Sequence, residues 1–202
     1  MDKKNDVQLI NDFLQGDIGS FNRLVNRWQG KLYRFSYRYL QDEEEAKEVV
    51  QKALIKIYKN LKKLKNPEKF SSWTYQITLN LCRDTLKSSH KTRLIFENSF
   101  SRSDNNESNP GLDDIADDYD SSRRVHKSDL QDIVKMTLAR LPEEQRVVII
   151  MKEYDGFKFS EIAEILNCPV NTAKARMYYG LKRMQKIMKN LNIDMEVLFN
   201  EM

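Results

Sequence analysis

The stretch SEIAEILNCPVNTAKARMYYG, residues 160–180, decides the fold class. Asn167 stands where two amphipathic segments meet, and asparagine tolerates the left-handed backbone that such a turn needs. Ala163 is small enough for two helices to approach closely, and we expect Asn171 or Thr172 to cap the second helix. The apolar residues that should form the core between the helices are Ile162, Leu166, Val170 and Ala173. This spacing is typical of a helix-turn-helix.

Helical periodicity extends through most of the 202 residues, and the chain holds only 6 glycines and 4 prolines. Chains rich in β-structure need more turn residues, so we expect an all-α protein. The segments with helical patterns are 7–15, 21–40, 43–64, one opening within 70–84, 123–140, 141–154, 159–167 and 172–191. Asp42 is expected to cap the third of these helices, and Ser71 or Ser72 the fourth.

Residues 97–122, ENSFSRSDNNESNPGLDDIADDYDSS, lose this periodicity and are rich in serine, asparagine and aspartate. We interpret them as part of a flexible acidic linker at 94–124, which joins two small helical domains at 1–93 and 125–202. Residues 1–93 carry 19 Lys and Arg against 11 Asp and Glu, whereas 94–122 carry 1 against 8. A basic segment beside an acidic one indicates a polyanionic partner.

The sequence contains no signature of an enzyme site. It has no phosphate-binding glycine loop, no HExxH, no GxSxG and no cluster of Cys and His. We therefore expect no catalytic residue, no cofactor, no metal and no small-molecule substrate. Cys82 and Cys168 are expected to be buried free thiols. Neither a transmembrane segment nor a secretory signal is recognisable, which favours a cytoplasmic protein.

Two helical faces are candidates for contact with nucleic acid. The second helix of the helix-turn-helix exposes Lys174, Arg176, Tyr178, Lys182 and Arg183, which suit a DNA major groove. The pattern also fits a plain helical hairpin with a solvated basic face. The helix at 43–64 carries lysines opposite its apolar stripe, at positions 52, 56, 59 and 63. These lysines fit either phosphate contact or simple solubility.

The stretch FSSWTYQITLNLCRD, residues 70–84, has two competing faces. One is an ordinary core stripe made of Tyr75, Leu79, Cys82 and Leu86. The opposite side presents Trp73, Gln76, Asn80, Asp84 and Lys87. Tryptophan is a poor choice for a purely solvated face, so this second face needs an explanation.

Four stretches together carry a resemblance to a known family. They are GDIGSFNRLVNRW (16–28), EVVQKALIKIY (48–58), FSSWTYQITLNLCRD (70–84) and LPEEQRVVIIMKEYDGFKFSEIAEILNCPVNTAKARMYYGLKRM (141–184). In this order and spacing the chain resembles the extracytoplasmic-function sigma factors of the sigma-70 family. The chain departs from the family pattern at Asn171, Ala173, Tyr179, Leu181 and Lys87, so the promoter preference at −35 does not transfer.

The resemblance implies a promoter-specificity subunit of bacterial RNA polymerase that recognises promoter DNA. The clamp helices of core polymerase would be contacted by Glu45, Glu48, Val49, Gln51 and Lys52. The linker would thread toward the active-site cleft, and the helix-turn-helix would also touch the polymerase flap. Many family members have an anti-sigma partner that is anchored in the membrane.

The resemblance also implies which residues contact the −10 element and which contact the −35 element of the promoter. The unpaired −10 strand would be held by Lys63, Lys65, Asn66, Phe70, Ser71, Ser72, Trp73, Gln76, Asn80, Arg83 and Lys87. The −35 element would be read by Asn171, Thr172, Lys174, Arg176, Tyr178, Tyr179, Lys182 and Arg183. The loop at 65–72 is expected to form a pocket for a flipped base. Trp73 fits either a stacking platform for a base or a core residue packed against the helix at 43–64.

Two other functions fit parts of the sequence. A helix-turn-helix regulator that binds duplex DNA without polymerase explains residues 141–188 but leaves the first ninety residues without a purpose. A helical adaptor that binds only proteins predicts that charge reversal at Lys174 and Arg176 has no effect.

Overall fold

The computed structural model describes residues 4–100 and 127–191, with side chains for 4–88 and 132–191. Within these ranges every regular element is a helix, so the expected all-α class is confirmed. Most of the expected linker, residues 101–124, lies outside the described part of the chain. None of the described helices combines the length and apolar composition that crossing a membrane requires.

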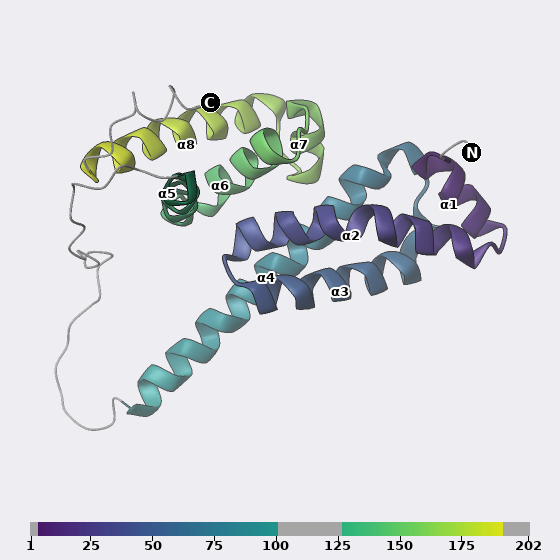
Figure 1. Ribbon diagram of the computed structural model, residues 1–202, viewed down its shortest axis with the longest axis horizontal. Coiled ribbons are helices and arrows are strands. Elements are labelled where there is room, and N and C mark those ends of the chain that lie inside the picture. The colour runs from purple at the N-terminus through teal and green to yellow at the C-terminus, as the bar shows by residue number, and fades with distance from the viewer. Residues whose placement is uncertain (1–3, 101–126, 192–202) are drawn as a thin grey trace.

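The N-terminal domain is built from α1 (Asp6–Leu14), α2 (Ile18–Leu40), α3 (Glu43–Asn60) and α4 (Phe70–Phe100). In Figure 1, α2, α3 and α4 run alongside one another and α1 covers one end of them. Leu32, Phe35 and Leu79 have no exposed surface in the centre of this bundle. Each such buried side chain contributes about 1.5–3 kcal/mol to folding, which explains why the apolar stripes determine the bundle.

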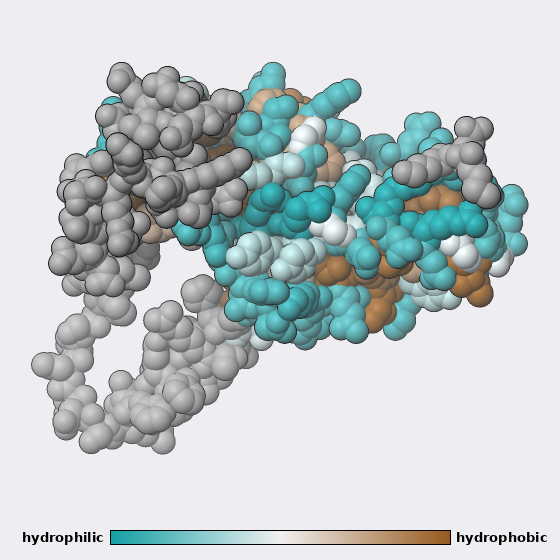
Figure 2. All heavy atoms as spheres, in the orientation of Figure 1, coloured by the Kyte–Doolittle hydropathy of each residue, from teal (hydrophilic) through white to brown (hydrophobic). Residues whose placement is uncertain are grey.

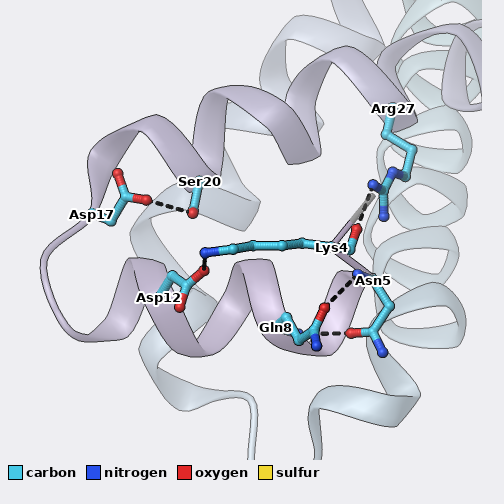
Figure 3. Close-up of polar contacts among 7 residues, drawn as sticks. All are labelled: Lys4, Asn5, Gln8, Asp12, Asp17, Ser20 and Arg27. Atoms are coloured by element: carbon cyan, nitrogen blue, oxygen red, sulfur yellow. Dashed lines mark hydrogen bonds and ion pairs between the residues drawn. The ribbon is translucent and has the colours of Figure 1, made fainter. Parts of the chain in front are cut away.

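Helix α1 is fixed at its start by a reciprocal pair of hydrogen bonds. The Asn5 side chain accepts from the Gln8 backbone N–H at 2.8 Å, and the Gln8 side chain accepts from the Asn5 N–H at 2.9 Å (Figure 3). Asp6 then ties α1 to α2, because its carboxylate accepts from Arg27 and, at 3.1 Å, from the Trp28 indole N–H. The capped helix is therefore held against the bundle.

Local signals in the N-terminal domain were only partly correct. The Asp42 cap is confirmed, because its side chain accepts from the Glu45 N–H at 2.8 Å. The helix expected at 43–64 ends earlier, at Asn60, and continues as a 3₁₀ turn. The expected serine caps at 71 and 72 are wrong, since α4 already begins at Phe70.

The far end of α4 corrects the expected linker boundary. This helix runs to Phe100, so residues 94–100 are helical rather than part of an irregular linker. Leu86 remains partly buried near the end of the side chains that are described. Most of the acidic residues that indicated a linker follow the end of this helix.

The C-terminal domain is built from α5 (Lys127–Ala139), α6 (Glu143–Ile149) with its π-helical extension Ile150–Tyr154, α7 (Phe159–Ile165) and α8 (Val170–Asn190). The left-handed Asn167 is confirmed, with φ of 49°. Ala163 and Ala173 are buried, as expected for closely packed helices. The expected core role of Val170 is wrong, because 39% of this residue is exposed.

The expected caps of α8 are also wrong. The helix begins at Val170 behind Pro169, which places Asn171 and Thr172 inside its first turn. Proline is well suited to this boundary because its fixed φ precedes a helix without losing a hydrogen bond. Asn171 is exposed there, and Thr172 is half-buried.

Gly180 allows α8 to lie close to α6. A Cβ atom at this position would lie 2.8 Å from Ile149 Cδ1 and 3.2 Å from Gln145 Cβ. We expect Gly180→Val to lower the free energy of unfolding of this domain by about 1–3 kcal/mol, because the added methyl groups overpack the contact. Thermal unfolding followed by circular dichroism measures this loss. Gly30→Val is the matched control, since a Cβ at Gly30 has its nearest neighbour at 3.5 Å; equal losses would contradict the prediction.

Candidate nucleic-acid interface

A cavity of about 260 Å³ lies beside the first turns of α4. It is lined by Lys63, Leu64, Lys65, Asn66, Lys69, Ser72, Trp73, Gln76, Glu164 and Ile165. Six of these belong to the predicted −10 set: Lys63, Lys65, Asn66, Ser72, Trp73 and Gln76. The structure therefore forms a pocket at the loop where the sequence analysis expected one for a flipped base.

The connection between α3 and α4 shapes this cavity. A proline at position 67 disfavours helix at Asn66, so the chain leaves the 3₁₀ turn Leu61–Lys63 in an extended conformation. The Asn66 side chain then accepts from the Glu68 N–H at 2.9 Å and starts a second 3₁₀ turn, Pro67–Lys69. Lys63 and Lys65 remain exposed around the resulting bend.

Trp73 lies between the cavity and the core of the N-terminal domain. Its ring lines the cavity, yet the residue is half-buried and packs against the core beside Phe70, with ring centroids 6.2 Å apart. Phe70 is only 3% exposed and meets Trp28 edge to face. The predicted contact of Phe70 with DNA is therefore corrected. The Phe70 ring packs beside Trp73 and has almost no surface exposed to solvent.

Five other predicted −10 residues of α4 differ in their exposure. Gln76, Asn80 and Lys87 are exposed, and Gln76 lies at the cavity itself. Ser71 and Arg83 are half-buried. The guanidinium of Arg83 points to the other domain, where its Nε donates to Glu143 Oε1 at 2.8 Å.

Four residues of the cavity were not among the predicted DNA contacts. Leu64 and Lys69 belong to the connection between α3 and α4, and Lys69 lies within the loop at 65–72 that was expected to form a pocket. Glu164 and Ile165 come from α7 in the other domain, 95 positions beyond Lys69 in the case of Glu164. The Lys69 Nζ lies 2.5 Å from Glu164 Oε1. No local pattern links residues so far apart.

The predicted polymerase-binding residues mostly share one exposed face of α3. Glu48, Gln51 and Lys52 are exposed, and Lys52 Nζ lies 2.7 Å from Glu48 Oε1. Glu45 is half-buried at the margin of this face. Val49 is corrected, because it is only 1% exposed and packs into the core of the domain.

Helix α8, the second helix of the helix-turn-helix, presents most of the predicted −35 set to solvent. Lys174, Tyr178, Tyr179, Lys182 and Arg183 are exposed, and the two tyrosine rings meet edge to face. Arg176 differs, because 23% of its side chain is exposed and its Nη2 lies 2.8 Å from Glu144 Oε2 of α6. This ion pair orients one side of the guanidinium toward α6.

The chain is similar to known proteins along most of its length. The sequence matches the family Sigma-70 region 2 over residues 24–92 and the family Sigma-70, region 4 over residues 131–184. It is 31% identical over 173 residues to the ECF RNA polymerase sigma-E factor of Escherichia coli strain K12, covering 86% of this chain and 88% of that protein. The chain belongs to the extracytoplasmic-function sigma factors.

Similarity to other proteins is consistent with membership of this family. The chain is 29% identical over 182 residues to the ECF RNA polymerase sigma factor SigW of Bacillus subtilis, covering 90% of this chain and 96% of the relative. Its fold is similar to that of CnrH, solved with the cytosolic domain of CnrY (TM-score 0.66, 20% identity, 92% and 97% covered). It is also similar to that of RpoE from Bartonella quintana, solved with the anti-sigma factor NepR (TM-score 0.59, 23% identity, 85% and 98% covered).

The protein is thus an RNA polymerase sigma factor, a class of protein that directs transcription initiation and is not a class of enzymes. The region 2 match falls within α1–α4 and the region 4 match within α5–α8, which we call the region 2 domain and the region 4 domain. A duplex-binding regulator that works without polymerase is not favoured, because it gives the region 2 domain no role.

Proposed function

We propose that this sigma factor captures the unpaired −10 strand at the cavity beside α4. The cavity itself is the observation that supports this assignment, because it brings Trp73, Gln76 and Asn66 together with Lys63 and Lys65. Unpaired bases stack on aromatic rings, a contact worth about 1–3 kcal/mol per base, while lysines neutralise the phosphates. Asn80 and Lys87 continue the same exposed face along α4.

The −35 element is assigned to the exposed face of α8. A recognition helix of this kind enters the major groove with its first turns toward the base edges. Asn171, Lys174 and Arg176 lie in the first two turns, and Lys182 and Arg183 lie further along, within reach of phosphates. Arginine suits guanine in particular, because its fork donates to O6 and N7 together.

Protein partners are assigned to other surfaces. Glu48, Gln51 and Lys52 on α3 form the proposed contact with the clamp helices of core polymerase, and the region 4 domain touches the flap. An anti-sigma protein is a further proposed partner, supported by the structural similarity to the sigma factor RpoE, which was solved with the anti-sigma factor NepR. We place the protein in the cytoplasm, where polymerase acts. A membrane-anchored anti-sigma protein would keep it inactive.

Run-off transcription tests this function directly. Core polymerase is mixed with a pool of genomic fragments, with and without the protein. We expect new transcription start sites that depend on the protein, and their alignment yields both promoter elements. Active polymerase and folded protein without any new start site would contradict the proposal.

The polymerase contact has its own prediction. Combining Glu48→Ala with Gln51→Ala should weaken binding to core polymerase about tenfold, because both side chains are exposed on one face of α3. Binding of the same full-length variant to duplex promoter DNA should stay unchanged. Fluorescence anisotropy measures both equilibria, and a parallel loss of DNA binding would show that the variant is misfolded or the surface is misassigned.

A further inference from the structure

The cavity assigned to the −10 strand is closed on one side by the region 4 domain. Glu164 and Ile165 of α7 form part of its wall, although every other lining residue comes from the region 2 domain. The Glu164 carboxylate lies 2.5 Å from the Lys69 ammonium. A negative charge therefore stands at the position where a DNA phosphate would meet this lysine.

Further contacts hold α7 in this position. The rings of Tyr75 and Phe157 meet edge to face with centroids 4.6 Å apart, at the junction of α4 with the segment before α7. Arg38 of α2 lies over the Tyr154 ring at 4.3 Å. The ion pair between Arg83 and Glu143 adds a third connection between the domains.

This interface also has features of a contact that opens. Lys69 and Glu164 both keep about half of their side chains exposed, at 55% and 45%, and such ion pairs are individually weak. The buried atoms Asp155 Oδ2 and Arg146 Nε lack hydrogen-bond partners within the described part of the chain. Interfaces between domains of one chain commonly resemble transient protein contacts, and unpaired buried polar atoms reduce their stability.

We propose that the region 4 domain covers the −10 cavity in the free protein, with Glu164 competing against the DNA strand for Lys69. The contact is autoinhibitory, since the two domains must separate before a strand enters the cavity. A sigma factor closed in this way is protected from binding single-stranded DNA outside the polymerase. The inference rests on the proposed function of the cavity.

Charge reversal at Glu164 tests the closure in the full-length protein. Glu164→Arg places a cation against Lys63, Lys65 and Lys69, so it should open the interface. Glu153→Arg is the matched control, because it makes the same change of charge at an exposed residue of the region 4 domain that does not line the cavity.

Two readouts separate closure from DNA binding. Acrylamide, a neutral quencher, reports the exposure of Trp73, whereas Trp28 is only 4% exposed and contributes little. A fluorescent single-stranded DNA pool of 12 random nucleotides reports binding by anisotropy. We expect Glu164→Arg to raise quenching and to strengthen binding about fivefold over Glu153→Arg. Adding Trp73→Ala should remove the gain in binding.

Each other result overturns a defined part of the inference. Unchanged quenching and unchanged binding would show that α7 does not cover the cavity in solution. Increased quenching without stronger binding would confirm the closure but refute the cavity as a DNA site. Equal gains in Glu164→Arg and Glu153→Arg would reduce the effect to net charge, and a gain that survives Trp73→Ala would place the DNA elsewhere. None of these measurements needs polymerase, so run-off transcription tests the sigma function separately.

Discussion

Arg176→Ala should reduce transcription from promoters that depend on the −35 element by roughly tenfold to a hundredfold, equivalent to about 1–3 kcal/mol. The physical reason is that an ion pair already orients the guanidinium. Its Nη2 is held at 2.8 Å by Glu144 of the neighbouring helix α6. The arginine therefore loses little side-chain entropy when its remaining donors meet a base edge. Run-off transcription on a promoter and on variants of its −35 element measures the effect.

Two companion variants decide what Arg176 does. Arg176→Lys keeps the charge but lacks the bidentate fork, so it should recover phosphate contact but not base discrimination. Glu144→Gln weakens the support from α6 and should give a smaller loss in the same direction. An equal loss on every −35 sequence would make Arg176 a phosphate contact, and no loss at all would remove it from the interface.

The closed arrangement of the two domains should become more stable as the pH falls from about 7.5 to about 5.5. Burial raises the pKa of the Asp155 carboxyl to about 6, against the opposing effects of the Tyr75 hydroxyl and the charges of Arg38, Arg34 and Lys31. Tyr75 lies on α4 and the three cations on α2, so separation of the domains removes all four and exposes the carboxyl to water.

The sign follows from the direction of this shift. The pKa of Asp155 is about 6 in the closed form and close to its ordinary value of 3.8 once the carboxyl is in water. Between these values only the closed form binds the proton, so acid favours closure, while above pH 6 the buried charge opposes it. Each unit of difference between the two pKa values corresponds to about a tenfold change in the closed-to-open ratio.

Acrylamide quenching of Trp73 across this pH range measures the equilibrium. The wild-type protein should be quenched less at low pH. Asp155→Asn is neutral throughout, so it should be quenched weakly at every pH and lose the dependence. Asp84→Asn is the control at an exposed carboxyl and should behave as wild type. A wild-type profile that rises toward acid would contradict the prediction.

Short-range signals in the sequence were reliable where one side chain acts on its own backbone. The Asp42 cap and the left-handed Asn167 were both predicted correctly, because each depends on atoms a few residues apart. The start of a helix was harder to predict where several nearby residues could each cap it. The serines at 71 and 72 looked like caps, but the 3₁₀ turn that Asn66 starts had already led into α4.

Periodicity placed residues on a face but did not fix what covers that face. Val49 and Phe70 fall next to other predicted contact residues in the sequence, yet both are buried, because neighbouring helices and rings enclose them. Trp73 remained ambiguous for the same reason, since it lines a cavity and also packs beside Phe70.

The sequence alone determined the helical class, the two-domain plan, the helix-turn-helix and most of the residues around the cavity that we assign to the −10 strand. These features follow from spacing along one helix or one loop, which the order of residues specifies directly. Only the tertiary structure brought Glu164 to Lys69, Phe157 to Tyr75 and Glu143 to Arg83. Such contacts join residues 60 or more positions apart, and they form only because two complete helical domains pack against each other.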